Sequence, residues 1–203
     1  MHWLGAIATL SLMLSACGPP VASTTGSDEP ASSQAPVDLS DFHIKLERGL
    51  CFGTCPFYTV EVRGDGLAEY CGVQFVKERG RRSRTISQRE IQPLIALLNA
   101  ADFFNLKENY IAAIDSPIYV ISASFGGRSH VVKESYGENM DMPRAVTQLQ
   151  NAIDAAARTA DWIGKTPEPG DPYPNANAEP IPDCLRDPVT VSYVIPDQPP
   201  AKH

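Results

Sequence analysis

Alternating apolar and polar side chains predict the first half of a β-sheet. Residues 43–48 (HIKLER) alternate, and residues 57–63 (FYTVEVR) also alternate and are rich in aromatic and β-branched types. Both patterns are typical of strands with one buried face. Gly64-Asp65-Gly66 predicts a hairpin turn, because glycine and aspartate tolerate positive φ. Residues 67–75 (LAEYCGVQF) then form the returning strand.

The next segment predicts a short strand and then a helix. After a turn at Gly80, Thr85-Ile86 closes a short fourth strand. Ser87 and Glu90 have the spacing of a capping box. Pro93 removes a backbone donor, so we expect the regular helix to begin near Gln92, with proline in its first turn. The apolar face of this helix falls at helical spacing and consists of Ile91, Leu94, Ile95 and Leu98.

A second hairpin and a second helix follow. Residues 118–125 and 128–133 are joined by Gly126-Gly127, and together they form a strong hairpin signal. The last helix is predicted over residues 143–160. The fold class is therefore α+β, with an antiparallel sheet of about five to six strands, two helices packed on it, and the order βββ(β)-α-ββ-α. The apolar stripe of the second helix consists of Val146, Leu149, Ile153 and Ala157.

The chain begins with an uncharged apolar stretch, residues 3–16, that is shorter than the ~20 residues of a membrane-spanning helix. It has the length of the apolar region of a signal peptide. It ends in Leu14-Ser15-Ala16-Cys17, which resembles the lipobox of bacterial lipoproteins. The resemblance implies cleavage before Cys17 and lipidation of that cysteine. Gly18, rather than aspartate, implies an outer-membrane location facing the periplasm. The other interpretation is a short buried helix with a core cysteine.

Composition divides the rest of the chain into three parts. Residues 17–41 are rich in Ser, Thr, Pro, Ala and Gly, so we expect a lipidated cysteine and a disordered tether. Residues 42–164 carry the α+β domain. Residues 165–203 are rich in proline and are expected to form an extended tail, to which residues 189–195 (VTVSYVI) could add an edge strand.

Several short motifs in the domain resemble one family of secreted bacterial domains, which is catalogued only as domain of unknown function 6438. The most specific is the run from Cys51 to Tyr58 (CFGTCPFY). The similarity covers roughly residues 42–164 and implies the domain without an activity. The other matching residues are Leu46-Glu47-Arg48, Gly64-Asp65-Gly66, Ala101-Asp102-Phe103-Phe104, Leu106-Lys107, Tyr136-Gly137 and Trp162-Ile163-Gly164.

Five cysteines matter most for the chemistry. Cys51 and Cys55 form either a structural disulfide that holds the loop between the first two strands, a redox pair, or part of a metal site with His43 as the nearest histidine. Once Cys17 carries lipid, the other four allow three pairings. We predict Cys51–Cys55, which share one short loop, and Cys71–Cys184, which both lie outside the family pattern.

Other polar residues give weaker signals. His130 has the position of a surface or packed strand histidine, and Asp115, Glu134 and Glu138 have no acid/base spacing, so we interpret them as solvated loop and strand-end charges. A basic run is either an anion-binding patch for phosphate or carboxylate groups or a solvated hairpin tip. That run consists of Lys77, Arg79, Arg81, Arg82 and Arg84.

These features favour binding over catalysis. The 203 residues carry a net charge of -7, which argues against nucleic-acid binding. The chain has no recognised catalytic, cofactor or metal motif, so we expect neither cofactor nor metal. The sequence predicts a non-catalytic cell-envelope lipoprotein that binds or scaffolds an envelope protein or a wall or lipid polymer. The alternative is a periplasmic thiol-disulfide protein that uses Cys51 and Cys55.

Overall fold

The computed structural model describes residues 37–113, 116–165, 172, 175 and 180–185. The predicted signal peptide (1–16), Cys17, the tether up to residue 36 and the predicted edge strand (189–195) lie outside these residues. Within the described part of the chain, no helix has the length and hydropathy needed to cross a membrane.

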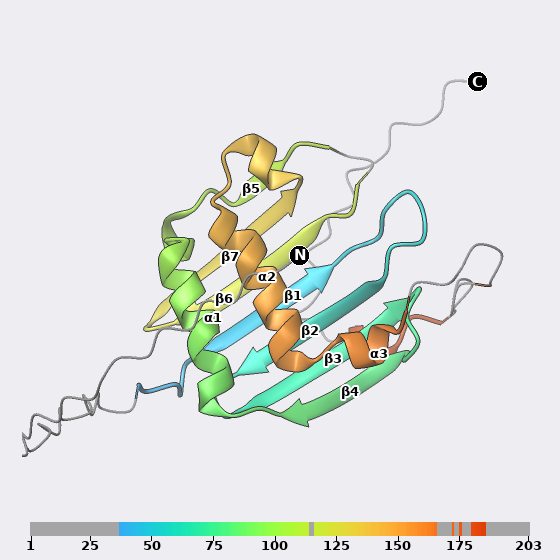
Figure 1. The fold of residues 1–203 in the computed structure, drawn as a ribbon, viewed down its shortest axis with the longest axis horizontal. Coiled ribbons are helices and arrows are strands. Elements are labelled where there is room, and N and C mark those ends of the chain that lie inside the picture. The colour runs from blue at the N-terminus through green and yellow to red at the C-terminus, as the bar shows by residue number, and fades with distance from the viewer. Residues whose placement is uncertain (1–36, 114–115, 166–171, 173–174, 176–179, 186–203) are drawn as a thin grey trace, which may run out of the picture. The chain divides into compact units, whose positions relative to one another are not determined.

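The described residues form a seven-stranded sheet in the order β4-β3-β2-β1-β6-β7-β5 (Figure 1). All neighbours pair antiparallel except β5, which runs parallel to β7. The first strand, β1, therefore lies in the middle and joins the two halves. The strands are β1 (His43–Arg48), β2 (Phe57–Arg63), β3 (Leu67–Gln74), β4 (Gly80–Thr85), β5 (Asn109–Ile111), β6 (Tyr119–Phe125) and β7 (Arg128–Ser135).

The α+β prediction is confirmed, although the sheet has more strands than the five to six expected. The unexpected strand is β5, whose three residues are too short to show alternation. The fourth strand occupies Gly80–Thr85, not Thr85-Ile86. Its arginines concealed it, because charged side chains are usual on an edge strand but lack the apolar signal of a buried one.

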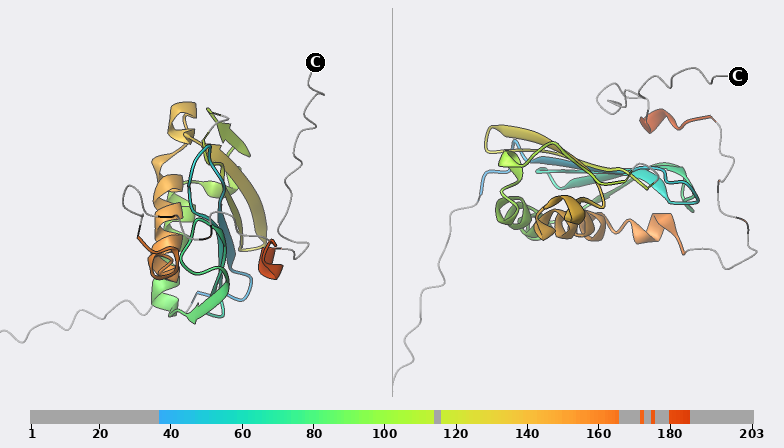
Figure 2. Two further views of the ribbon diagram at one scale, coloured as in Figure 1. Left: turned by 90° about the vertical axis from the view of Figure 1, so that its right-hand side faces the viewer. Right: turned by 90° about the horizontal axis from the view of Figure 1, so that it is seen from above.

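Two long helices cover one face of the sheet and lie side by side (Figure 2). These are α1 (Gln88–Ala100) and α2 (Arg144–Ala157). A short helix, α3 (Ala160–Ile163), follows α2, because Arg158 adopts a left-handed conformation (φ 54°) that ends the predicted 143–160 helix early. Three 3-10 turns complete the described elements: η1 (Phe103–Asn105), η2 (Gly137–Met140) and η3 (Asp183–Leu185).

The expected start of α1 near Gln92 is wrong. The helix begins at Gln88, one residue after Ser87, and Pro93 lies inside it. The capping box is present: the Ser87 backbone N–H donates to Glu90 at 2.7 Å. This box and the buried apolar face together outweigh the one backbone donor that proline removes.

The core lies between the sheet and the two long helices. The predicted apolar stripes of both helices are buried there, against alternate residues of the central strands. Leu39, which the sequence placed in the tether, is only 5% exposed and belongs to this core. Its carbonyl lies where a side chain on Gly64 would have to be, so this turn requires glycine.

Residues 180–185 of the proline-rich tail lie on the opposite face of the sheet, where Figure 2 shows η3. Cys184 in η3 bonds to Cys71 of β3, and the Cα atoms lie 6.0 Å apart. Leu185 is buried beside Cys71 and Val73 in a small second apolar cluster. The predicted Cys71–Cys184 pair therefore holds one turn of the tail against the sheet.

Candidate functional site

A pocket of about 380 Å³ opens at one end of the sheet, beside the first half of α2. The end of β1, the start of β6 and the end of β7 form its floor, because these strands alternate in direction and meet at this edge. The η2 turn and α2 form its walls. Most of its lining residues have polar side chains, and these include Arg48, Tyr119, Glu134, Tyr136, Glu138, Asn139, Thr147, Gln150 and Asn151.

Arg48 is fixed at one side of the pocket. Its Nε and Nη2 atoms donate to Oδ2 of Asp154 at 2.9 and 2.7 Å. The Tyr58 and Thr159 hydroxyls each donate to Oδ1 of the same carboxylate at 2.9 Å. The guanidinium also lies over the Tyr119 ring, 4.6 Å from its centroid. This network joins β1, β2 and β6 to α2 beside the pocket.

Arg48 and Tyr58 are each held in one protonation state. Burial alone lowers the pKa of Arg48, but the attraction of Asp154 and the other contacts outweigh it, so the pKa is raised. Burial, reinforced by the negative charge of Asp154, raises the pKa of the Tyr58 hydroxyl far above its usual value. Arg48 therefore stays cationic and Tyr58 stays a neutral donor across the physiological pH range.

Glu134 lies on the other side of the pocket, and its interpretation as a solvated strand-end charge is wrong. The residue is only 6% exposed. One carboxylate oxygen accepts the backbone N–H of Gly137 at 3.0 Å, and the other accepts the Gln150 amide at 2.9 Å. The sequence could not show this burial, because the α2 residue that covers Glu134 is distant along the chain.

The pocket rim is built on unusual backbone. Tyr136 has φ 52°, which is costly for a residue with a side chain, yet the residue is 62% exposed. At Gly137 an added Cβ would lie 2.7 Å from the sulfur of Met142, so a larger residue would require the Met142 side chain to move. Strained backbone conformations of this kind are more frequent at binding sites than elsewhere in proteins.

The loop after Arg48 contains the predicted Cys51–Cys55 disulfide, with Cα atoms 5.7 Å apart. It presents Phe52, whose side chain is 96% exposed, at the same end of the sheet. Neither cysteine begins a helix. His43 stands at the opposite end of β1, roughly 16 Å along the strand from Arg48 at the usual rise per residue. Instead of completing a metal site, it pairs with Glu61 at 2.9 Å.

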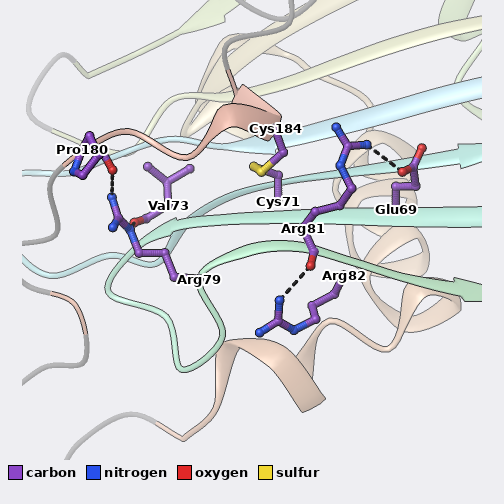
Figure 3. Close-up of a disulfide and its surroundings, with 8 residues drawn as sticks. All are labelled: Glu69, Cys71, Val73, Arg79, Arg81, Arg82, Pro180 and Cys184. Atoms are coloured by element: carbon purple, nitrogen blue, oxygen red, sulfur yellow. Dashed lines mark hydrogen bonds and ion pairs between the residues drawn. A yellow bond between two sulfur atoms is a disulfide. The ribbon is translucent and has the colours of Figure 1, made fainter.

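The basic run does not converge into one patch. The β3–β4 register places Arg82 and Arg84 on the helix side of β4 and Arg81 on the other side. Arg81 pairs with Glu69 at 2.7 Å, and Figure 3 shows its side chain directed away from that of Arg82.

The other basic side chains are also engaged. Arg79 donates to the backbone carbonyls of Val73 and Pro180 and so helps to hold the tail (Figure 3). The remaining partners are Glu78 for Lys77 and Arg82, and Glu90 with the Ala156 carbonyl for Arg84.

Replacing Arg81, Arg82 and Arg84 together with glutamine is therefore expected to lower stability. Loss of several partly exposed ion pairs should reduce the free energy of unfolding by about 1–2 kcal/mol. Chemical denaturation measures this loss. A variant of unchanged stability that no longer binds anionic vesicles at low salt would support an anion-binding patch instead.

His130 has a structural role. His130 faces the helix side of β7 and packs edge-on against Phe103, with ring centroids 5.8 Å apart. Its Nε2 atom is buried without a hydrogen-bond partner. In the described part of the chain no group of three or more metal-binding side chains comes together.

Comparison with known families identifies the domain. The model of the family described as Domain of unknown function (DUF6438) matches residues 42–157, more than half of the chain. The chain belongs to this family. Comparison of the chain with curated proteins gives no match.

The DUF6438 motifs now have structural roles. The Cys51–Cys55 run forms the closed loop, and Tyr136-Gly137 forms the pocket rim. The carbonyls of Trp162 and Ile163 accept the backbone N–H groups of Glu78 and Lys77, which fixes the β3–β4 turn against α3. Of the motifs discussed, two reach the pocket: Leu46-Glu47-Arg48 through Arg48, and Tyr136-Gly137. These were the sequence signals that could have located the site.

Proposed function

We propose that this protein is a cell-envelope lipoprotein whose DUF6438 domain binds a small polar ligand, or a polar segment of a larger partner, without catalysis. Cys17 would hold the chain at the membrane, and residues 18–36 would provide reach. The lipobox-like Leu14–Cys17 sequence supports the anchor. The strand-end pocket supports the binding role.

The observation that carries the binding role is the construction of this pocket. Its volume is at the lower end of the range for small-molecule sites. Arg48 and Glu134 stand fixed on either side by hydrogen bonds, and Tyr136 holds a costly backbone conformation at the rim. Specific binding sites are concave and use a small number of fixed polar groups to orient the ligand.

The alternative, a thiol-disulfide protein, has less support. Redox-active cysteines are usually activated at a helix N-terminus or beside a basic group. Cys51 and Cys55 instead close a loop that precedes a strand. A reduction potential separates the two functions, because a structural bond resists glutathione, whereas a catalytic bond is reduced more readily.

Blocking the pocket is expected to abolish binding. Thr147→Trp fills it from α2, and Gln148→Trp on the exposed side of the same helix is the matched control. The chain from residue 17 with Cys17→Ser, labelled with ¹⁵N, is mixed with the soluble small-molecule fraction of envelopes from cells that make the protein. Amide signals of residues 136–139 and 150–151 should shift in the wild type and in the control only.

Two results would contradict this function. One is the absence of any shift at the pocket residues of the wild type. The other is an equal shift in Thr147→Trp, which would show that binding occurs outside the pocket.

A further inference from the structure

The charge of Glu134 is not balanced by the protein around it. Among the described residues its partners are two neutral donors, the Gly137 backbone and the Gln150 amide. No basic side chain in this part of the chain pairs with it. A buried carboxylate is costly unless a positive charge compensates it.

Asp154, which lies on α2 beside the Gln150 partner of Glu134, is by contrast a compensated carboxylate. Gln150 and Asp154 are four residues apart on α2 and so lie on one face of the helix. Asp154 is compensated by Arg48 and receives two hydroxyl donors as well. Glu134 has no such counter-ion, yet it lines the pocket. The positive charge that it lacks would fit within that pocket.

The opposite side of the pocket offers a donor. The Nε and Nη2 atoms of Arg48 are used by Asp154, with Asn151 at 3.4 Å from Nη2. Its Nη1 atom has no hydrogen-bond partner among the described residues. Asp154 already accepts from four donor atoms, so it does not need Nη1.

The strand register sets the distance between these two groups. Arg48 pairs with Tyr119, and Tyr119 pairs with Glu134, so the three residues lie in one row across β1, β6 and β7. Two strand spacings separate the backbones of Arg48 and Glu134 by about 10 Å. Tyr119 lies between them and provides an aromatic floor.

We propose, on the basis of the binding function above, that the pocket takes a ligand with a free ammonium group and a carboxylate, as in an amino acid or a short peptide. The ammonium group binds Glu134, and the carboxylate binds Nη1 of Arg48. Glu138 at the rim adds negative charge. Because Asp154 already neutralises Arg48, a purely anionic ligand is disfavoured.

The test is an NMR titration of the ¹⁵N-labelled chain from residue 17 with four probes at neutral pH. These are L-alanine, the dipeptide Ala-Ala, N-acetyl-Ala-Ala and Ala-Ala-amide. Ala-Ala should shift the Gly137 amide and the Gln150 side-chain signals. N-acetylation removes the ammonium charge and should weaken binding at least tenfold, whereas amidation should have a smaller effect. L-alanine binding as tightly as Ala-Ala would assign a free amino acid in place of a peptide.

Glu134→Gln provides the matched variant. Rotation of the Gln150 amide by 180° lets both hydrogen bonds re-form, so the melting temperature should not fall. Affinity for Ala-Ala should drop at least tenfold. Glu61→Gln, on the opposite face of the sheet, should retain the wild-type affinity.

Equal binding of the acetylated and free peptides to the wild type would overturn this inference, whatever the variants do. It would also be overturned if Ala-Ala and L-alanine did not shift the pocket signals but the envelope fraction did. That result would leave the proposed binding function intact. If neither the envelope fraction nor the probes shift them, the proposed function fails as well.

Discussion

Asp154→Ala is expected to lower the free energy of unfolding by about 3 kcal/mol. The substitution leaves the Arg48 guanidinium, whose side chain is only 15% exposed, without its counter-ion. It also removes the acceptor of the Tyr58 and Thr159 hydroxyls. Breaking a buried pair from one side costs about 3–5 kcal/mol, and the partial exposure of this pair places the effect at the lower end.

Urea denaturation measures this loss, and Asp161→Ala is its control. Asp161 pairs with Arg158 at 3.1 Å, but both side chains are more than half exposed. Loss of that pair should cost below about 1 kcal/mol. Equal losses for the two variants would show that the Arg48–Asp154 pair does not join the sheet to α2 as described.

Loss of the Cys71–Cys184 disulfide is the second large expected effect. The bond joins residues 113 positions apart, and a loop of that length stabilises a protein by nearly 5 kcal/mol in the chain-entropy model. Measured gains are usually 2–4 kcal/mol, so we expect about 3 kcal/mol for Cys71→Ser with Cys184→Ser. The same variant should expose Leu185 and Val73, which now pack beside the bond.

The Cys51→Ser and Cys55→Ser double variant is the comparison. That bond spans four positions, and the same model gives it about 2 kcal/mol. Denaturation under non-reducing conditions should therefore rank the long-range bond above the short one. A peptide map that joins Cys55 to Cys71, or finds a free thiol at Cys184, would contradict the pairing itself.

Local patterns predicted most of the fold. Alternation located β2, and the Gly126-Gly127 turn located the β6–β7 hairpin. Both glycines adopt the positive φ that the turn requires. The capping box marks the start of α1, but the prediction placed that start near Gln92 because it gave Pro93 too much weight. The β5 strand was missed because three residues carry no period, and its pairing with β7 is decided by tertiary contacts.

The candidate site was much harder to predict. Near Glu134 the order of apolar and charged residues in β7 does not show which side chains are buried. The burial of Glu134 depends on Gln150, sixteen residues later, and that contact exists only after α2 packs on the sheet. The cysteine pairs were predicted because four cysteines allow few combinations, whereas a pocket assembled from five segments leaves no comparable signal.

The basic run shows the opposite error. Its clustered charge in sequence drew attention as an anion-binding patch, but strand geometry sends successive arginines to opposite faces. Glu69 on β3 then pairs with Arg81, and Glu78 in the following turn pairs with Arg82. Charge density along the chain is therefore a poor guide to charge density on the surface when the segment is a strand.

The envelope location, on which the proposed function rests, is tested most directly by one mass measurement. The native protein is extracted from membranes with detergent, and the mass of its N-terminal peptide is determined. The account predicts that residues 1–16 are absent and that Cys17 carries a diacylglyceryl thioether. A peptide that still contains residues 1–16, with an unmodified Cys17, would contradict it.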